Sequence, residues 1–300
     1  TRVIVMSEKC PAIWPYECHQ ANLHCGGHKR IDLMSELMWQ QLDEMGVSHV
    51  LLLQLDSRVC RKVEPSEEVQ TIVPPAISMT LYFIIFGSLI GRRIGEMDGV
   101  PYTTFIAPGL IMMAVITNSF GNTVSSFFSG KMHRHLEEML VSPMIFPTIV
   151  TGYVIGGLVR GLAVAILVTV VALFFTELTV VHPIVTFSTV ILTSMVFSVA
   201  GILNAIYAKS FDEISIIPTF VLTPLTYLGG VFFSIELLSP AWQAAAQLNP
   251  ILYMVSAFRY GMLGSSDIPI GTAYAIIFVA LIGLYGLVIY LLNRGTGIRT

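Results

Sequence analysis

Six long apolar stretches follow one another along the chain from residue 71 onward. They cover about 71–91, 103–129, 146–175, 184–207, 216–234 and 272–293. A helix needs about 20 apolar residues to cross the hydrocarbon core of a bilayer. The pattern therefore predicts an all-α, polytopic membrane protein with six transmembrane helices and both ends of the chain on one side of the membrane.

A shorter apolar pattern lies between the fifth and sixth stretches. Residues 235–270 contain two apolar segments of about 8 to 12 residues at helical period, which meet at Asn249 and Pro250. Each segment is too short to cross the bilayer, so the pattern predicts a re-entrant or interfacial helical hairpin.

A polar segment, KMHRHLEEMLVSP at residues 131–143, separates the second and third stretches. At helical period its apolar side chains share one face; these are Met132, Leu136, Met139 and Leu140. We therefore expect a short amphipathic helix that ends at Pro143, with an apolar face that its own loop cannot cover. Two interpretations remain open: the helix docks onto a partner protein, or it is solvated or lies among lipid headgroups.

The composition and the charges agree with a membrane protein and orient it. The chain is 54% hydrophobic and 12% charged, against roughly 25% charged residues in soluble domains. Basic residues near the ends of spans favour the cytoplasmic side. Eight lie on the side of the termini (Arg58, Arg61, Lys62, Lys131, Arg134, Lys209, Arg294 and Arg299), and three lie opposite (Arg92, Arg93 and Arg259). The termini and the 131–143 helix are thus expected in the cytoplasm, and the hairpin outside the cell.

Residues 1–69 differ from the rest. They hold ten of the 19 acidic residues and all four cysteines. The spacing of Cys18, His19, His24 and Cys25 does not match zinc modules, so no metal site is expected. We interpret 1–69 as an atypical cytoplasmic segment. Three interpretations of this segment remain open. It is a helix that lies along the cytoplasmic membrane interface, a tail without a stable fold, or sequence that is non-native or out of frame.

The apolar stretches lack the groups that ion-coupled carriers and ATPases use. None of the six contains Asp or Glu, although proton- and sodium-driven carriers usually place carboxylates in the membrane. The chain also has no GxxxxGK[ST] loop to bind phosphates. It is therefore expected to have no catalytic residues, no cofactor and no nucleotide site of its own.

Polar side chains inside the stretches are candidates for a translocation path. They are Asn118, Asn122 and Ser125 in the second stretch, Arg160 in the third, and Thr219, Thr223 and Tyr227 in the fifth. Hydrogen bonding between helices is the alternative explanation for the neutral residues. Arg160 either contacts a polar or anionic substrate group or pairs within the protein, since a charge cannot face lipid without a large cost.

Small residues recur at four-residue intervals in the third stretch, at Gly152, Gly156, Gly157 and Gly161. Such spacing lets helix backbones approach closely. It predicts that the third helix lies at the centre of the bundle.

Several longer motifs resemble the permease subunit of type-2 ABC exporters. They are VPPAISMTLYFIIFG, EEMLVSP, NAIYAKSFDEISIIPTFVLTPLTYLGG and LNPILYMVSAFRYG. The resemblance covers residues 70–300, and 1–69 does not share it. It implies a homodimeric permease in a bacterial inner membrane that binds two copies of a separate ATP-binding subunit.

The resemblance also implies roles for individual segments. The 131–143 helix would be the coupling helix that contacts the ATPase, through His133, Arg134, Leu136, Glu137, Glu138 and Leu140. Residues 235–262 would form extracellular re-entrant helices, and the second and fifth spans would border the translocation path.

The substrate stays open among lipid-linked saccharides, amphipathic drugs and other hydrophobic metabolites. Two other functions compete: a secondary carrier or channel without an ATPase, and a membrane-anchored scaffold or sensor.

Overall fold

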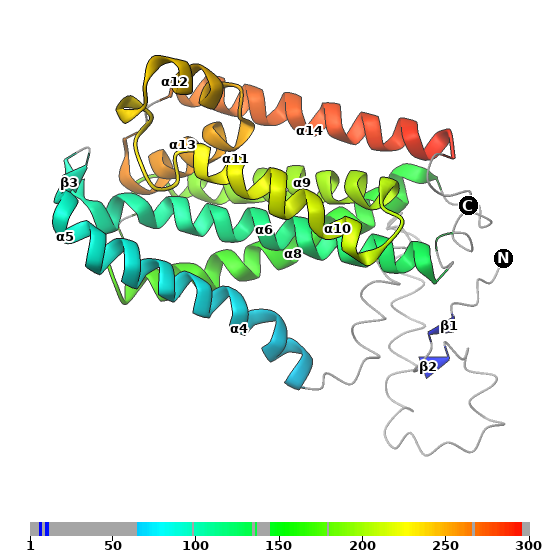
Figure 1. The fold of residues 1–300 in the computed structure, drawn as a ribbon. Coiled ribbons are helices and arrows are strands. Elements are labelled where there is room, and N and C mark those ends of the chain that lie inside the picture. The colour runs from blue at the N-terminus through cyan, green and yellow to red at the C-terminus, as the bar shows by residue number, and fades with distance from the viewer. Residues whose placement is uncertain are drawn as a thin grey trace.

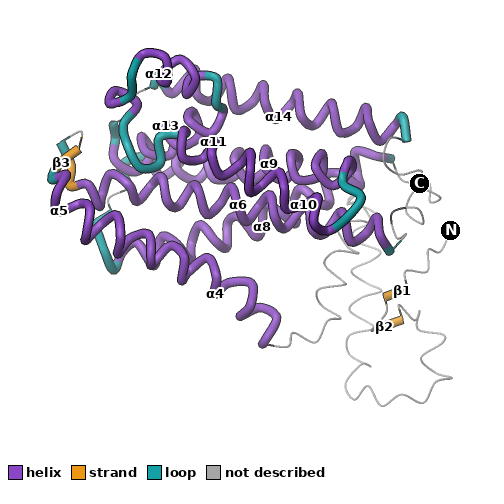
Figure 2. The backbone as a smooth tube through the Cα atoms, in the orientation of Figure 1, coloured by secondary structure: helices purple, strands orange, loops and turns teal. Residues whose placement is uncertain are grey.

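Most helices of the protein run side by side in one elongated bundle (Figure 1). The computed structural model describes residues 6–7, 10–11, 65–97, 99–133, 136, 145–178, 180–265 and 268–295. Helices make up almost all of this part of the chain, and its loops gather at the two ends of the bundle (Figure 2). Two short antiparallel pairs are its only strands: β1 (Met6–Ser7) with β2 (Cys10–Pro11), and β3 (Glu96–Met97) with β4 (Val100–Pro101).

Four of the described helices are long and apolar enough to cross a membrane. They are α6 (Tyr102–Met132), α8 (Phe146–Leu173), α9 (Pro183–Tyr207) and α14 (Ile270–Asn293). At 1.5 Å per residue, even the shortest spans roughly 36 Å, more than the hydrocarbon core of about 30 Å. They coincide with the second, third, fourth and sixth predicted stretches.

The first and fifth stretches fold into helices with a π-helical middle. The first helix consists of α4 (Pro65–Tyr82), η1 (Phe83–Ile90) and α5 (Gly91–Ile94). Because α4 begins at Pro65, the predicted boundary between residues 69 and 70 lies inside it.

The fifth helix consists of α10 (Phe211–Ile217), η2 (Pro218–Leu222) and α11 (Thr223–Leu228). It ends at Leu228, not at residue 234 as predicted. The cause is the Gly229–Gly230 turn, in which Gly230 adopts a positive φ of 75° that other residues rarely take.

The centre of the bundle is formed by α6 and α9. Over an apolar 18-residue segment of each helix, 72% is buried inside the protein in both α6 and α9, against 33% in α8 and 22% in α14. The prediction that the third helix is central is therefore wrong. Two glycines of α8, Gly157 and Gly161, share the face that meets α6 and α9. The opposite face exposes Val159, Ile166 and Val170.

The predicted break at Asn249 and Pro250 is confirmed. After η3 (Ile235–Leu237), α12 (Pro240–Gln247) and α13 (Pro250–Leu263) form a helical hairpin. The side chain of Asn249 caps α13 by accepting from the N–H of Ile251 at 3.0 Å, and donates to the carbonyl of Leu225 at 2.6 Å. The turn of the hairpin therefore lies beside the last turn of the fifth helix, and α13 packs against α6, α9 and α14.

The two ends of the bundle carry different elements. One end, here called the hairpin end, holds β3–β4 and α12–α13 (Figure 1). The other, here called the coupling end, holds the start of α4, the end of α6 and the end of α14. The described chain thus enters its first helix and leaves its last helix at the same end.

Candidate functional site

One face of α6 carries polar side chains that the rest of the described protein leaves partly or fully uncovered. Thr117 and Ser125 are exposed, and Asn118 and Asn122 are half-buried. A Cβ added at Gly121, between them, would meet no atom within 4 Å. An uncovered polar face is unusual on a helix that is otherwise at the centre of a membrane bundle.

These side chains direct their donors into their own helix. Thr117 Oγ1 donates to the carbonyl of Met113 at 2.8 Å, Asn118 Nδ2 to that of Ala114 at 2.9 Å, and Ser125 Oγ to that of Gly121 at 2.8 Å. Such bonds satisfy a hydroxyl donor, or one of the two N–H groups of an asparagine amide, without a neighbouring helix. The oxygen lone pairs remain as acceptors, so this face offers hydrogen-bond acceptors, beside the further amide N–H groups, to water or to a substrate.

A cleft of about 230 Å³ separates α6 from the fifth helix. It is lined by Met113, Thr117, Pro218, Thr219, Leu222, Thr223 and Thr226, and we call it the threonine cleft. Thr223 Oγ1 bonds the carbonyl of Pro218 at 2.9 Å, five residues back, as the wider π-helical turn requires. The structure thus brings the predicted residues Thr219 and Thr223 together with Thr117, which the sequence analysis did not single out.

A second hollow lies along the same helix, towards the coupling end. It measures about 310 Å³ and is almost entirely apolar. Its lining residues are Phe120, Phe197, Ala200, Leu203, Asn204, Tyr207, Ile217, Val221 and Leu222. Because Leu222 borders both hollows, the fifth helix is only loosely packed against α6 and α9 around η2.

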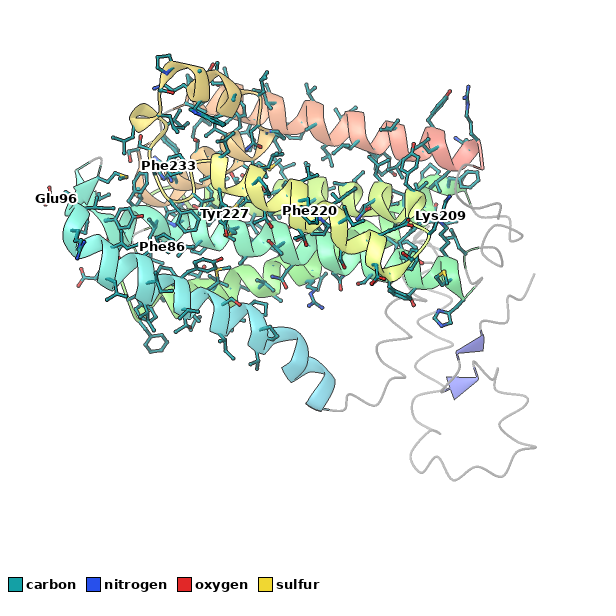
Figure 3. The ribbon with its side chains drawn as sticks, viewed as in Figure 1. Phe86, Glu96, Lys209, Phe220, Tyr227 and Phe233 are labelled. Carbon is teal, nitrogen blue, oxygen red and sulfur yellow. The ribbon has the colours of Figure 1, made fainter. Side chains whose placement is uncertain are left out.

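Aromatic side chains join the first and fifth helices towards the hairpin end. Phe86 and Phe232 have ring centroids 4.5 Å apart, and Tyr227 and Phe232 lie at 5.5 Å. The hydroxyls of Tyr82 and Tyr227 are 3.5 Å apart. Phe86, Tyr227 and Phe220 are labelled along these helices in Figure 3. The predicted path residue Tyr227 therefore belongs to this aromatic group, not to the threonine cleft.

Arg160 is separate from these residues. It is a half-buried side chain on α8 and lines neither hollow. The structure therefore does not bring it together with the polar residues of the second and fifth stretches.

The coupling end contains the start of the predicted amphipathic helix. Lys131 and Met132 form the last turn of α6, and His133 caps that helix with Nδ1 2.8 Å from the carbonyl of Ser129. Leu136 is 2% exposed and belongs to the main hydrophobic core. At Leu136, then, the apolar face is covered by the protein's own bundle, contrary to the expectation of an unpartnered face. Arg134, Glu137, Glu138 and Leu140 lie outside the described residues.

A contact at this end was missed by the sequence analysis. Lys131 Nζ lies 2.9 Å from the carbonyl oxygens of both Ile206 and Ala208, at the end of α9. A basic residue in the last turn of a helix suggests an interaction with that helix's own carbonyls. Here the lysine binds a neighbouring helix, and no pattern in the sequence indicates this.

Comparisons with known proteins agree with this architecture. The family model described as "ABC-2 type transporter" matches residues 66–263. The chain is 54% identical over 232 residues to the inner membrane transport permease YadH of Escherichia coli strain K12, covering 77% of this chain and 91% of that protein. It is 28% identical over 210 residues to nodulation protein J of Neorhizobium galegae, covering 68% and 77% respectively. The chain belongs to the ABC-2 type transporter family of membrane transport proteins.

Proposed function

We propose that this chain is the transmembrane permease subunit of an ATP-driven exporter in the bacterial inner membrane. It works as a homodimer and binds a separate ATP-binding subunit. Membership of the ABC-2 type transporter family and the absence of a phosphate-binding GxxxxGK[ST] loop both support a separate source of ATP hydrolysis. The similarity to an Escherichia coli inner membrane transport permease supports the location.

Six membrane spans fit this proposal best. The first helix runs continuously from Pro65 to Ile94 and the fifth from Phe211 to Leu228, in addition to the four long apolar helices. The turn of the hairpin at Asn249 reaches Leu225, inside the end of the fifth helix. The hairpin is therefore proposed to be re-entrant.

The orientation follows from the basic residues of the two ends. Among the described residues, Lys131, Lys209 and Arg294 lie at the coupling end, and Arg92, Arg93 and Arg259 lie at the hairpin end. These are equal in number, so the orientation rests on the further basic residues that the sequence places on the side of the termini, namely Arg58, Arg61, Lys62, Arg134 and Arg299; they favour the cytoplasm for the coupling end. The ATP-binding subunit is then proposed to dock there, on residues 133–140 other than the buried Leu136.

The observation that carries the proposal is the uncovered polar face of α6 beside the threonine cleft. In lipid, its acceptor oxygens would find no donors, which is unfavourable in a hydrocarbon environment. A second copy of the chain placed over this face would enclose it and leave a water-filled path between the protomers. Two-fold pairing is the usual arrangement of homo-oligomers. Asn118, Asn122, Ser125, Thr219 and Thr223 would then border the path, with Tyr227 near its outer end.

A thiol at Thr117 tests whether the threonine cleft is open to water. In a background with the four native cysteines replaced by serine, we expect Thr117→Cys to react with a water-soluble maleimide, because thiolates form in water and not in lipid. Adding Thr219→Trp should fill the cleft and slow the reaction by about tenfold. Phe220→Trp is the matched control, since Phe220 is exposed and does not line the cleft, and it should leave the rate unchanged. Equal rates in both variants would contradict a water-filled cleft.

A double substitution tests the coupling role of the 133–140 segment. We expect Glu138→Ala with Leu140→Ala to leave membrane insertion and the hydrolysis rate of the ATP-binding subunit nearly unchanged. In a chain that carries Thr117→Cys alone, ATP should change the reactivity of the cysteine. When Glu138→Ala and Leu140→Ala are added, this ATP-induced change should disappear. The reason is that a docking contact transmits motion and does not build the bundle.

The matched control for this experiment changes the same residue types at the other end of the bundle. Glu177→Ala with Leu237→Ala alters two exposed residues and should behave like the wild type. A normal ATP response in the Glu138/Leu140 variant would remove the docking role. Failure of the purified wild-type chain to retain any ATPase would favour a carrier or channel without an ATPase, or a membrane-anchored scaffold or sensor.

A further inference from the structure

Lys131 joins the last turn of α6 to the end of α9. Its Nζ donates to the carbonyl oxygens of Ile206 and Ala208, each at 2.9 Å, and lies 3.5 Å from that of Ala205. The last carbonyls of a helix have no partner within the helix and carry its negative dipole end. The three donors of an ammonium group match this set of acceptors. The contact is therefore a charge-assisted cap on α9 supplied by another helix.

The residues that follow α9 are held by further contacts at the same place, and we call α6's last turn, the end of α9 and the start of α10 the contact block. Residues 208–210, here called the elbow, connect α9 to α10. Asn204 Nδ2 donates to the carbonyl of Ile214 across the elbow at 3.0 Å. The ring of Phe211 packs edge-on against Phe128 of α6, with centroids 4.9 Å apart. The start of the fifth helix is thus fixed to the end of α6 at several points.

The N-terminus of α10 is also well defined. Ser210 caps the helix by accepting from the N–H of Glu213 at 3.3 Å, and Glu213 Oε2 accepts from the N–H of Lys209 at 2.7 Å. These bonds hold the elbow and the first turn of α10 together. A displacement of the elbow would accordingly move α10 as a unit.

The contact block lies between the proposed docking segment for the ATP-binding subunit and the wall of the threonine cleft. On one side, α6 passes through Lys131 and His133 into the segment proposed to dock the ATP-binding subunit. On the other side, α10 continues into η2, which borders the threonine cleft and the apolar hollow. The hollows leave η2 room to move, whereas α6 and α9 are tightly packed.

We propose that Lys131 is a positioning residue that transmits movement of the 133–140 segment to the fifth helix, through the carbonyls of Ile206 and Ala208. This inference rests on the proposed function. It adds that the wall of the cleft, formed by α10 and η2, is moved from the elbow. Lys131 itself contacts neither the substrate nor ATP.

The test uses the full-length chain in proteoliposomes with its ATP-binding subunit. The readout is the ratio of Thr117→Cys reactivity with and without ATP, measured with a water-soluble maleimide, beside the rate of ATP hydrolysis. Lys131→Met should reduce the ATP-induced change at least about fivefold, while hydrolysis stays within about twofold of the wild type, since the methionine cannot bind the carbonyls. Lys131→Arg should restore most of the response.

Lys209→Met is the matched control, because Lys209 is an exposed lysine of the elbow and only its backbone N–H has a described bond. It should leave the response unchanged. A normal response in Lys131→Met would overturn the inference and leave the proposed function intact. Absence of any ATP response in the wild type would overturn both.

A cross-linked variant keeps the test informative if Lys131→Met does not fold. Lys131→Cys and Ala208→Cys, joined by a short bifunctional thiol reagent in a chain that keeps Thr117, should show a greater ATP-induced change in tryptic cleavage at the exposed Lys209 than the same variant before cross-linking. A covalent link replaces the transmitted contact without restoring the charge. No gain on cross-linking would contradict transmission through this contact.

Discussion

Gly161→Leu should separate α8 from the centre of the bundle and prevent the protein from being purified as a stable particle. A Cβ at this position would overlap Ser119 Oγ of α6 and Ser194 Oγ of α9. Both serines are fully buried, so their hydroxyls can make room only by rotating within a packed core. Even Gly161→Ala should lower stability by about 1–3 kcal/mol, the usual effect of overpacking a core. In melting temperature this corresponds to about 3–10 °C for a domain of this size.

The matched control for this experiment is the same change on another span. Gly283 of α14 has no atom within 4 Å of its added Cβ, so Gly283→Leu should insert and melt like the wild type. Gly283→Ala should be neutral or slightly stabilising, because alanine favours a helix over glycine by about 1 kcal/mol. The measurement is the melting temperature in detergent together with the fraction of monodisperse protein. Equal melting of the Gly161 and Gly283 leucine variants would contradict the close helix contact.

Arg259→Met should loosen the hairpin from the bundle. The Arg259 side chain is 3% exposed, and its Nη2 donates to the carbonyl of Gly230 at 2.7 Å. Its guanidinium carbon lies 4.0 Å from the ring centroid of Phe105 on α6. One side chain thus connects α13, the turn after the fifth helix, and α6. A charged hydrogen bond and a buried cation–π contact together contribute about 3 kcal/mol.

This effect should appear as faster proteolysis between α12 and α13 and a lower melting temperature in detergent. Arg259→Lys keeps the charge but lacks the planar group that stacks on the ring, so it should recover only part of the stability. Arg93→Met, an exposed arginine at the same end, is the control and should show neither effect. Unchanged proteolysis and melting in Arg259→Met would mean that the hairpin is held by apolar packing alone.

Apolar length alone was enough to predict the four long helices. Each of α6, α8, α9 and α14 coincides within a few residues with an uninterrupted apolar stretch, because a helix in lipid must satisfy its own backbone over the whole hydrocarbon thickness. The same criterion overestimated the fifth helix. Val231 is fully buried, but it lies in the turn after Gly229–Gly230, and apolar length does not distinguish a buried turn from a helix.

Helix position was harder to predict than helix identity. The glycines of α8 indicated a close approach, and Gly157 and Gly161 make it. They did not indicate how many faces of α8 are covered, because a close contact on one side of a helix needs small residues on that side only. Burial on all sides is a property of the neighbours, which places α6 and α9 at the centre.

The candidate site was predictable where residues lie on one helix face. Asn118, Asn122 and Ser125 share the uncovered face of α6 because they are three or four residues apart. Thr117 lies four residues before Gly121 and eight before Ser125, so it could have been included. The meeting of Thr117 with Thr219 and Thr223 depends on how the fifth helix packs, and the Lys131 contact depends on the end of α9. Both are tertiary features that no local pattern in the chain encodes.

ATP binding at the coupling end is proposed to change which side of the membrane reaches the threonine cleft. The direct measurement is the labelling of Thr117→Cys by a membrane-impermeant maleimide added to one side of proteoliposomes at a time, with the ATP-binding subunit bound. We predict faster labelling from the coupling end without nucleotide, and faster labelling from the hairpin end when ATP is bound. Equal labelling from both sides, or a preference that ATP does not change, would contradict the claim.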